Sequence, residues 1–253
     1  MDELRSKLFY EQKNGYDLID TDERIAVEDY CGQYMSYLND SRTEREAVKN
    51  AIALAEEQGF VEYELGMELK PGMRIYRNNR GKALMLAVIG KKSLAEGAVI
   101  AGAHVDSPRL DLKQITMYET DELCYFKTHY YGGIKKYQWT TIPLELRGVV
   151  CVCDKGEVKR VEVRVGDKPG DPKFVITDLL PHLGREQGKK PLNEAIPSET
   201  LNILVGSRPL RDDDGSDRVK VEVLRLLNEK YGITEEDFIS AELQAVPAAN
   251  ARD

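Results

Sequence analysis

The first sixty residues carry apolar side chains at helical spacing. Between Asp22 and Leu38 these side chains fall at Ile25, Val27, Tyr30, Cys31, Tyr34, Met35 and Leu38. That is close to the i, i+3, i+4 rhythm of an amphipathic helix. A second apolar stripe begins after Thr43, with acidic residues in its first turn, where they stabilise the positive end of a helix, and Gly59 as the expected C-terminal cap. The pattern predicts two consecutive helices.

The pattern then changes to that of strands. Residues 73–76 and 82–89 flank the turn sequence Asn78-Asn79-Arg80-Gly81, and together they predict a β-hairpin. Residues 98–103 (AVIAGA) form a short, wholly apolar run, which is typical of a strand buried on both faces. This predicted strand leads directly into His104.

The middle of the chain is rich in alternating apolar and polar positions. Such alternation recurs at 124–129, 142–153 and 158–165, and glycine-containing loops separate the runs. It predicts a second, smaller β domain. A helix is then predicted from Asp217 to Tyr231, followed by a strand at 239–246 that returns to the first domain.

These elements predict an α/β fold. We expect residues 1–110 to begin an α/β domain, residues 111–210 to form an inserted β-rich domain, and residues 211–253 to return to the first domain. After the last predicted strand, residues 247–253 contain no closing helix. We therefore expect the α/β domain to be incomplete within this chain.

Composition and charge narrow the function classes. The chain has 253 residues, a net charge of -8, 42% apolar and 32% charged residues, as in a globular protein. The acidic balance argues against a nucleic-acid partner, because such proteins concentrate Lys and Arg on one face. No segment has the ~20 apolar residues of a membrane-spanning helix, and the charged N-terminus lacks the apolar core of a signal peptide. Four cysteines without a CxxC pair fit reduced thiols, and we expect a cytoplasmic protein.

The candidate chemistry lies at His104-Val105-Asp106. Both side chains follow a predicted buried strand, and the carboxyl ends of strands are where α/β sheets place their ligand crevices. Residues two apart share a face, so Asp106 is placed to accept a hydrogen bond from the far ring nitrogen of a metal-bound His104, which fixes the tautomer. The simpler alternative is a histidine that caps a strand, and a lone His-x-Asp supports that alternative more often. The three histidines of the chain cannot build a His-rich zinc cage.

Several ordered motifs resemble one family of peptidases. The segment Ala103-His104-Val105-Asp106-Ser107-Pro108-Arg109-Leu110 is similar to the Ser-His-Thr-Asp-Ser-Pro segment of the aspartyl aminopeptidase and aminopeptidase I family of zinc metallopeptidases. The resemblance continues at Tyr130-Tyr131-Gly132-Gly133, at Trp139, at residues 143–150, at Pro181-His182-Leu183 and at residues 199–209 and 240–243. Val105 stands where the family has Thr, and Pro143 where it has Arg.

The resemblance implies a catalytic α/β domain interrupted by a β-rich domain that helps build a homo-oligomer. It implies a hydrolase that removes N-terminal residues from peptide substrates. It also implies two bound metal ions, usually Zn²⁺, for which Co²⁺ or Mn²⁺ can substitute. His104 matches a metal ligand, Asp106 the acidic catalytic residue that orients it, and His182 a further histidine at the metal site. For His182 the alternative is a surface loop histidine.

The same resemblance implies that further ligands and the general base follow residue 253. We therefore expect the chain alone to be an N-terminal fragment without peptidase activity. An alternative is a non-catalytic oligomerisation or regulatory relative of the family. A third is a related family of tetrahedral aminopeptidases with the same split layout.

Overall fold

The computed structural model describes residues 2–253, apart from the side chains of residues 2 and 154. The chain divides into two compact units. One unit consists of the residues up to Asp40 together with 250–253, and the other is Ser41–Ala249. Short 3-10 turns lie at Gly15–Asp17, Leu94–Glu96, Lys136–Gln138, Gln187–Lys189, Ser198–Thr200 and Glu236–Ser240.

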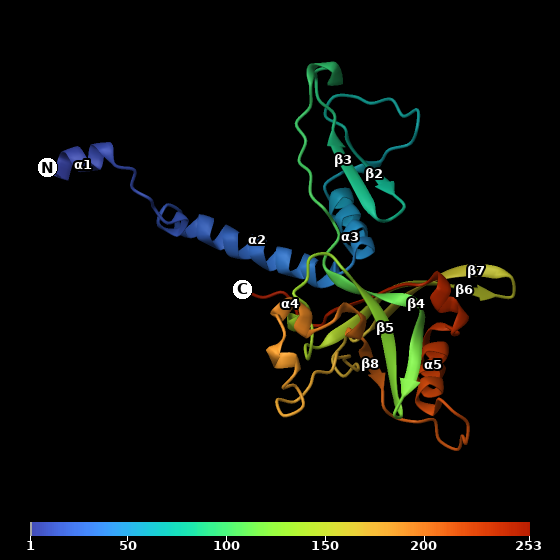
Figure 1. Cartoon of the computed structure of the whole chain (residues 1–253). Helices are drawn as coiled ribbons and strands as arrows, with labels where there is room; N and C mark the ends of the chain where they lie inside the picture. Colours follow the sequence, from blue (N-terminus) through green and yellow to red (C-terminus); the bar gives the residue numbers. More distant parts are fainter. Residues whose placement is uncertain (1) are drawn as a thin grey trace. The chain divides into compact units, whose positions relative to one another are not determined.

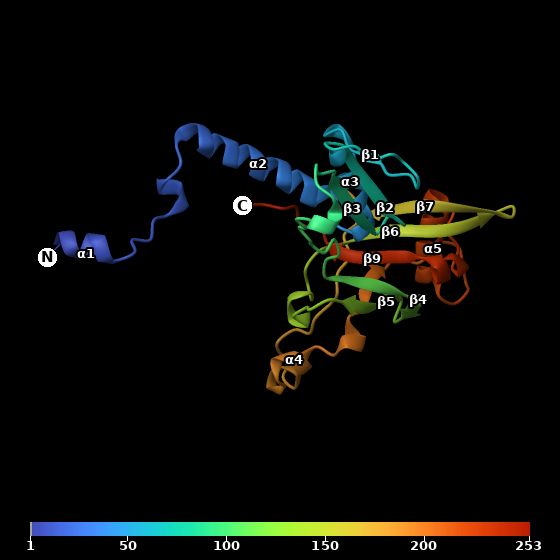
Figure 2. The same cartoon turned by 90° about the horizontal axis from the view of Figure 1, so that it is seen from above.

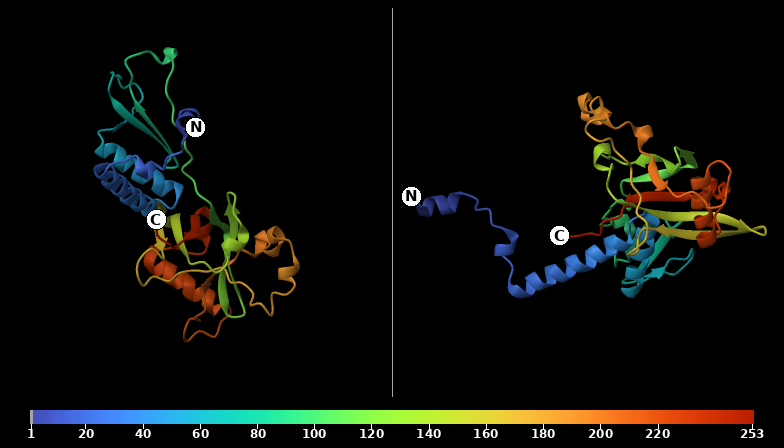
Figure 3. Two further views of the ribbon diagram at one scale, coloured as in Figure 1. Left: turned by 90° about the vertical axis from the view of Figure 1, so that its left-hand side faces the viewer. Right: turned by 90° about the horizontal axis from the view of Figure 1, so that it is seen from below.

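The first unit is helical. It contains α1 (Asp2–Leu8) and the long helix α2 (Thr21–Asp40), which is drawn as one continuous ribbon in Figure 3. A capping box begins α2, because the Asp20 carboxylate accepts from the Glu23 N–H at 2.9 Å and the Glu23 carboxylate accepts from the Asp20 N–H at 3.1 Å. The predicted helix is confirmed. None of its described residues is buried, and Tyr30 is 70% exposed.

The second unit begins with α3 (Glu44–Glu57) and a small sheet. Thr43 caps α3 by accepting from the Glu46 N–H. The strands β1 (Val61–Glu62), β2 (Arg74–Asn79) and β3 (Ala83–Val88) form a sheet in the order β1-β2-β3. Arg80 and Gly81 both have positive φ angles, of 58° and 68°, in the three-residue connection between Asn79 and Ala83, and the Lys82 N–H donates to the Asn79 carbonyl at 3.1 Å. The predicted helix and hairpin are both confirmed.

The predicted strand at 98–103 is absent from the structure. The chain between the turn Leu94–Glu96 and the next strand runs as coil (Figure 1), and Val99 and Ile100 are 104% and 87% exposed. A strand exists only where its N–H and C=O groups pair with a neighbour. Within the described residues this segment pairs with no strand, so its apolar composition alone does not make it one.

A larger sheet follows, with six strands. These are β4 (Arg109–Thr120), β5 (Leu123–Tyr131), β6 (Leu144–Asp154), β7 (Glu157–Val165), β8 (Ile203–Gly206) and β9 (Glu242–Pro247). Their order is β7-β6-β9-β4-β5-β8, and Figure 2 shows β7, β6, β9, β4 and β5 side by side. The helix α5 (Arg218–Tyr231) packs against β4, β5 and β8, while the short α4 (Leu192–Ala195) lies in the connection before β8. The predicted β-rich middle and α/β fold are confirmed.

The strand β9 lies between β4 and β6 and is antiparallel to both. A strand was predicted here, but with the first domain as its partner, and the structure pairs it with the β-rich segment. The pairing requires glycine at Gly148, because a Cβ there would overlap the backbone oxygen of Glu242. Its φ of 143° also disfavours other residues. Where one domain ends and the next begins stays a prediction.

Charged groups lie in the interior beside the apolar core. The core contains Leu110, Leu144, Leu146, Val150, Val163 and Ile203, each at most 1% exposed. Next to it, Glu145 is 1% exposed and accepts from Arg147 at 2.7 Å and from Arg42 at 3.1 Å. Arg147 also donates to Glu46 of α3 at 2.9 Å. These ion pairs tie α3 to the sheet. Within the described residues, no helix has the length and apolar content needed to cross a membrane.

Candidate functional site

The register of two strands brings two separate sequence motifs together. Arg109 is the first residue of β4, Tyr131 is the last of β5, and the two are opposite each other in the antiparallel pair. The His104–Arg109 segment therefore lies beside Tyr130–Gly133. Gly132, with a φ of 81°, sits against Pro108, whose Cα would be 3.5 Å from an added Cβ.

The His104 imidazole is bound to Asp106 through its Nδ1 atom. Nδ1 lies 2.8 Å from the backbone oxygen of Asp106 and 3.5 Å from its Oδ1. Both oxygens are acceptors, so this geometry favours the proton on Nδ1 and leaves the Nε2 lone pair free to bind a metal. The sequence predicted the carboxylate as the partner, and the backbone oxygen is in fact the nearer atom. The His104 side chain is 81% exposed.

Charged and polar groups of the sheet act on Asp106. The pKa of Asp106 lies below its ordinary value, mainly through its interaction with the Tyr131 phenol and further through its own N–H, His104 and Arg109. The same interaction raises the pKa of Tyr131. The Arg109 guanidinium lies 4.0 Å from the centre of the Tyr131 ring, a cation–π contact.

Arg109 and Tyr131 were not predicted as functional residues. Both lie inside the quoted motifs, but their role depends on the β4–β5 register, and alternation along a single strand does not reveal its register. The sequence feature that could have pointed to Tyr131 is the Tyr130-Tyr131-Gly132-Gly133 motif.

No contact among the described residues joins His182 to this cluster. It follows Pro181 in an exposed turn. Among the described residues, no three His, Cys, Asp or Glu side chains come together in a group that could hold a metal ion. The structure thus brings His104 and Asp106 together and does not join His182 to them in such a group. Judged by its donor atoms, the cluster offers zinc one imidazole and does not by itself form a closed site.

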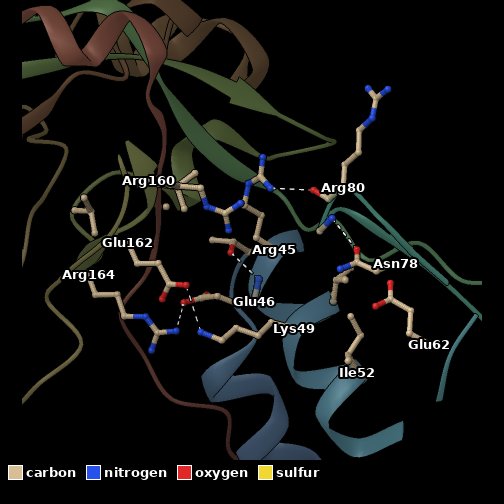
Figure 4. A pocket seen from close by; sticks show the side chains of 16 residues that line it. Arg45, Glu46, Lys49, Ile52, Glu62, Asn78, Arg80, Arg160, Glu162 and Arg164 are labelled. Carbon is tan, nitrogen blue, oxygen red and sulfur yellow. Dashed lines mark hydrogen bonds and ion pairs between the residues drawn. The ribbon is translucent and has the colours of Figure 1, made fainter. Parts of the chain in front are cut away.

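A pocket of about 610 Å³ lies elsewhere in the same unit, between α3, the β2–β3 turn and the β6–β7 pair (Figure 4). Three of the cations that line it are paired: Arg45 with Glu242 at 2.7 Å, Lys49 with Glu162 at 3.3 Å, and Arg164 with Glu46 at 2.8 Å. Arg80 points away from the other labelled side chains (Figure 4). None of the three predicted site residues lines this pocket, so it is not the predicted metal site.

Comparisons of the sequence with known proteins all point to one peptidase family. The family model described as aminopeptidase I zinc metalloprotease (M18) matches residues 37–253. A curated relative from Clostridium acetobutylicum, named "Probable M18 family aminopeptidase 1", is 46% identical over 254 residues, which is 99% of this chain and 54% of the relative. The chain spans about half the length of the curated relatives it matches.

Solved structures agree with this match. The M18-family aminopeptidase from Thermotoga maritima superposes with a TM-score of 0.85 at 40% identity, over 96% of this chain and 52% of that one. A structure described as the S. cerevisiae mApe1 dodecamer gives a TM-score of 0.63 at 20% identity, over 89% of this chain and 49% of that one, and it supports the fold alone.

Proposed function

We propose a function from one premise, which is that this chain belongs to the aminopeptidase I zinc metalloprotease (M18) family. The chain is part of a metal-dependent aminopeptidase that releases N-terminal amino acids from peptides. The observation that supports this proposal is the His104 imidazole, whose Nδ1 is bound to Asp106, so that Nε2 is the nitrogen left to bind a metal. When bound, zinc supplies a Lewis acid and a water whose pKa is lowered to about 7.

The residues of this chain supply only part of that site. Catalytic zinc takes three protein ligands, and the described residues do not gather three. In this proposal His104 is one ligand, Asp106 is the carboxylate that orients it, and His182 is a further contributor. The other ligands come from the remainder of the M18 length, since the relatives are about twice as long as this chain. Two ions, exchangeable for Co²⁺ or Mn²⁺, are part of the same proposal.

Exposed apolar segments of the second unit also support the proposal that the rest of the M18 length is needed to cover them. In β3, an edge strand, Met85 is 68% and Val88 is 62% exposed, and residues 98–103 are apolar and unpaired. An exposed apolar edge is a pairing hazard that proteins normally cover. We propose that strands from the second half of the M18 length cover β3 and convert 98–103 into the strand that its sequence predicts.

The assembly and the compartment are also proposals. A homo-oligomer is proposed because the resemblance to the M18 family implies one. A cytoplasmic location is supported by cysteines that are all unpaired in the structure. The alternative is a chain that serves as a non-catalytic oligomerisation or regulatory member of such an assembly.

The test compares two proteins. One is this chain alone, and the other is this chain joined to the second half of the Clostridium acetobutylicum relative. With zinc and a short peptide, we expect the joined protein to release N-terminal amino acids and the chain alone to release none. His104→Ala in the joined protein should abolish turnover, with a larger loss than the ~10–100-fold typical of residues behind a ligand.

His129→Ala is the matched control, because His129 lies on β5 and stacks on Tyr130 at 5.7 Å. It should keep its activity. Full turnover by the His104→Ala protein would overturn the proposed site. A joined protein that assembles without binding zinc would favour the non-catalytic alternative.

A further inference from the structure

The pocket of Figure 4 is lined by more positive than negative side chains. Its carboxylates are Glu46, Glu62 and Glu162, and its cations are Arg45, Lys49, Arg80, Arg160 and Arg164. This excess of cations is unexpected in a chain whose net charge is -8. We propose that the pocket binds a phosphate-type oxyanion between β7 and α3. The proposal goes beyond the proposed aminopeptidase function and does not depend on it.

One wall of the pocket is a face of β7. Arg160, Glu162 and Arg164 alternate along this strand, so their side chains leave the same face. The antiparallel pairing with β6 fixes that face, because it places Arg164 opposite Arg147 and Glu162 opposite Val149. Two guanidinium groups therefore flank a single carboxylate along this wall.

The facing wall is the helix α3, and ion pairs join it to β7. Lys49 of α3 is bound to Glu162 at 3.3 Å, and Arg164 is bound to Glu46 of α3 at 2.8 Å. Glu46 also accepts from Arg147 at 2.9 Å. The carboxylates on these two walls are thus already paired with cations, and neither is left to neutralise a further one.

Arg160 is the cation on β7 that these carboxylates leave over. Within the described residues, its guanidinium forms no hydrogen bond or ion pair. Figure 4 shows it pointing toward Arg45, which is itself held by Glu242 at 2.7 Å and by the backbone oxygen of Arg80 at 3.1 Å. A guanidinium presents five N–H donors in a planar fork that matches the oxygens of a phosphate. An oxyanion beside Arg160 would satisfy these donors and separate two like charges.

The size of the pocket bears on what carries the oxyanion. Its volume of about 610 Å³ lies within the ~300–1,000 Å³ typical of small-molecule sites and exceeds what one inorganic phosphate fills. Ile52 and Val149 add apolar surface beside the cations. The chemistry recognised is the phosphate group, and the additional room favours a phosphate attached to a larger organic molecule.

The experiment titrates the ¹⁵N-labelled chain with inorganic phosphate and, separately, with ADP. The arginine Nε–H signals are followed by NMR at constant ionic strength. We expect saturable shifts of Arg160 and Arg164 with both probes. Tighter binding of ADP would identify a phosphate on a larger molecule, and equal affinities would identify free phosphate.

Arg160→Ala should weaken phosphate binding about tenfold, because one charge-assisted contact is lost. Arg80→Ala is the matched control, since it removes the same charge from the same pocket but from a side chain that points away from the others (Figure 4). It should leave the affinity unchanged.

Glu162→Gln tests the same site in the opposite direction. It removes the carboxylate between two guanidinium groups and releases Lys49, so phosphate binding should become tighter. A gain in affinity cannot come from misfolding.

Three results would overturn the proposal. The first is the absence of saturation with either probe. The second is an equal loss of affinity in Arg160→Ala and Arg80→Ala, which would show general attraction to a positive surface only. The third is unchanged or weaker binding by Glu162→Gln.

Discussion

The buried carboxylate of Glu145 offers a quantitative test of how the second unit is held together. The residue lies on β6 at 1% exposure and bridges Arg147 at 2.7 Å and Arg42 at 3.1 Å. Glu145→Ala removes the shared partner of two guanidinium groups, whose side chains are only 5% and 11% exposed. Both cations then stay inside with fewer acceptors.

The size of the effect follows from what each cation retains. Removing one partner of a buried ion pair costs about 3–5 kcal/mol. Arg147 keeps Glu46 at 2.9 Å, and Arg42 keeps the backbone oxygens of Pro247 and Ala249 at 2.6 and 2.8 Å. We therefore expect the lower end of that range, about 3 kcal/mol of lost unfolding free energy.

Urea unfolding followed by tryptophan fluorescence measures this loss. Trp139 is the single tryptophan of the chain and is 8% exposed in the core of the same unit. Lys49→Ala is the control, because the Lys49–Glu162 pair is 63% and 53% exposed and should contribute about 0.5 kcal/mol or less. If Glu145→Ala costs no more than Lys49→Ala, the ion-pair argument is wrong.

Three further outcomes are expected. Gly148→Ala should lower the unfolding free energy by about 3 kcal/mol or prevent folding in the same urea assay, because the added Cβ overlaps the backbone of β9. Gly170→Ala is the control: Gly170 has a φ of 87° and open space around it, so only the ~1–2 kcal/mol of left-handed backbone strain should be lost. Cys124, fully buried and with its pKa raised to about 12 by burial, should resist alkylation in native protein while exposed Cys153 reacts, as read by mass spectrometry. The pKa of Tyr76 is raised from 10.0 to about 12, mainly by its hydrogen bond to a glutamate of α3. Its stabilising contribution is therefore present below pH 10 and lost as the pH rises towards 12. Tyr76→Phe should show a smaller fall in stability across that window, and an identical fall would refute the assignment.

The local elements were predictable from the sequence, and their partners were not. The helices 21–40 and 44–57 and the hairpin at Arg80-Gly81 are set by side chains a few residues apart, and the family resemblance is confirmed by the match over 37–253. The run 98–103 has the composition of a buried strand, but composition records a preference for burial and does not supply hydrogen-bonding neighbours. For the same reason the sequence predicted the strand β9 but not its pairing with β4 and β6.

In the candidate site, too, local contacts were predictable from the sequence and long-range ones were not. His104 and Asp106 are two residues apart, so their proximity follows from the sequence. Tyr131 lies beside Arg109 only because β4 and β5 pair in this register, and that register is a long-range result. The metal and catalytic roles of His104, Asp106 and His182 stay predictions.

The position of β9 has a consequence for biosynthesis. On the ribosome, the β4–β5 and β6–β7 hairpins emerge long before the strand that joins them, since Leu110 and Leu146 both pair with Ala245. Isolated hairpins are marginal in water and leave unpaired edges. The nascent chain therefore holds two hairpins with unpaired edges until β9 is synthesised. The sheet is completed late, in a single long-range pairing step. Chaperone dependence and aggregation during expression should be greatest in that interval.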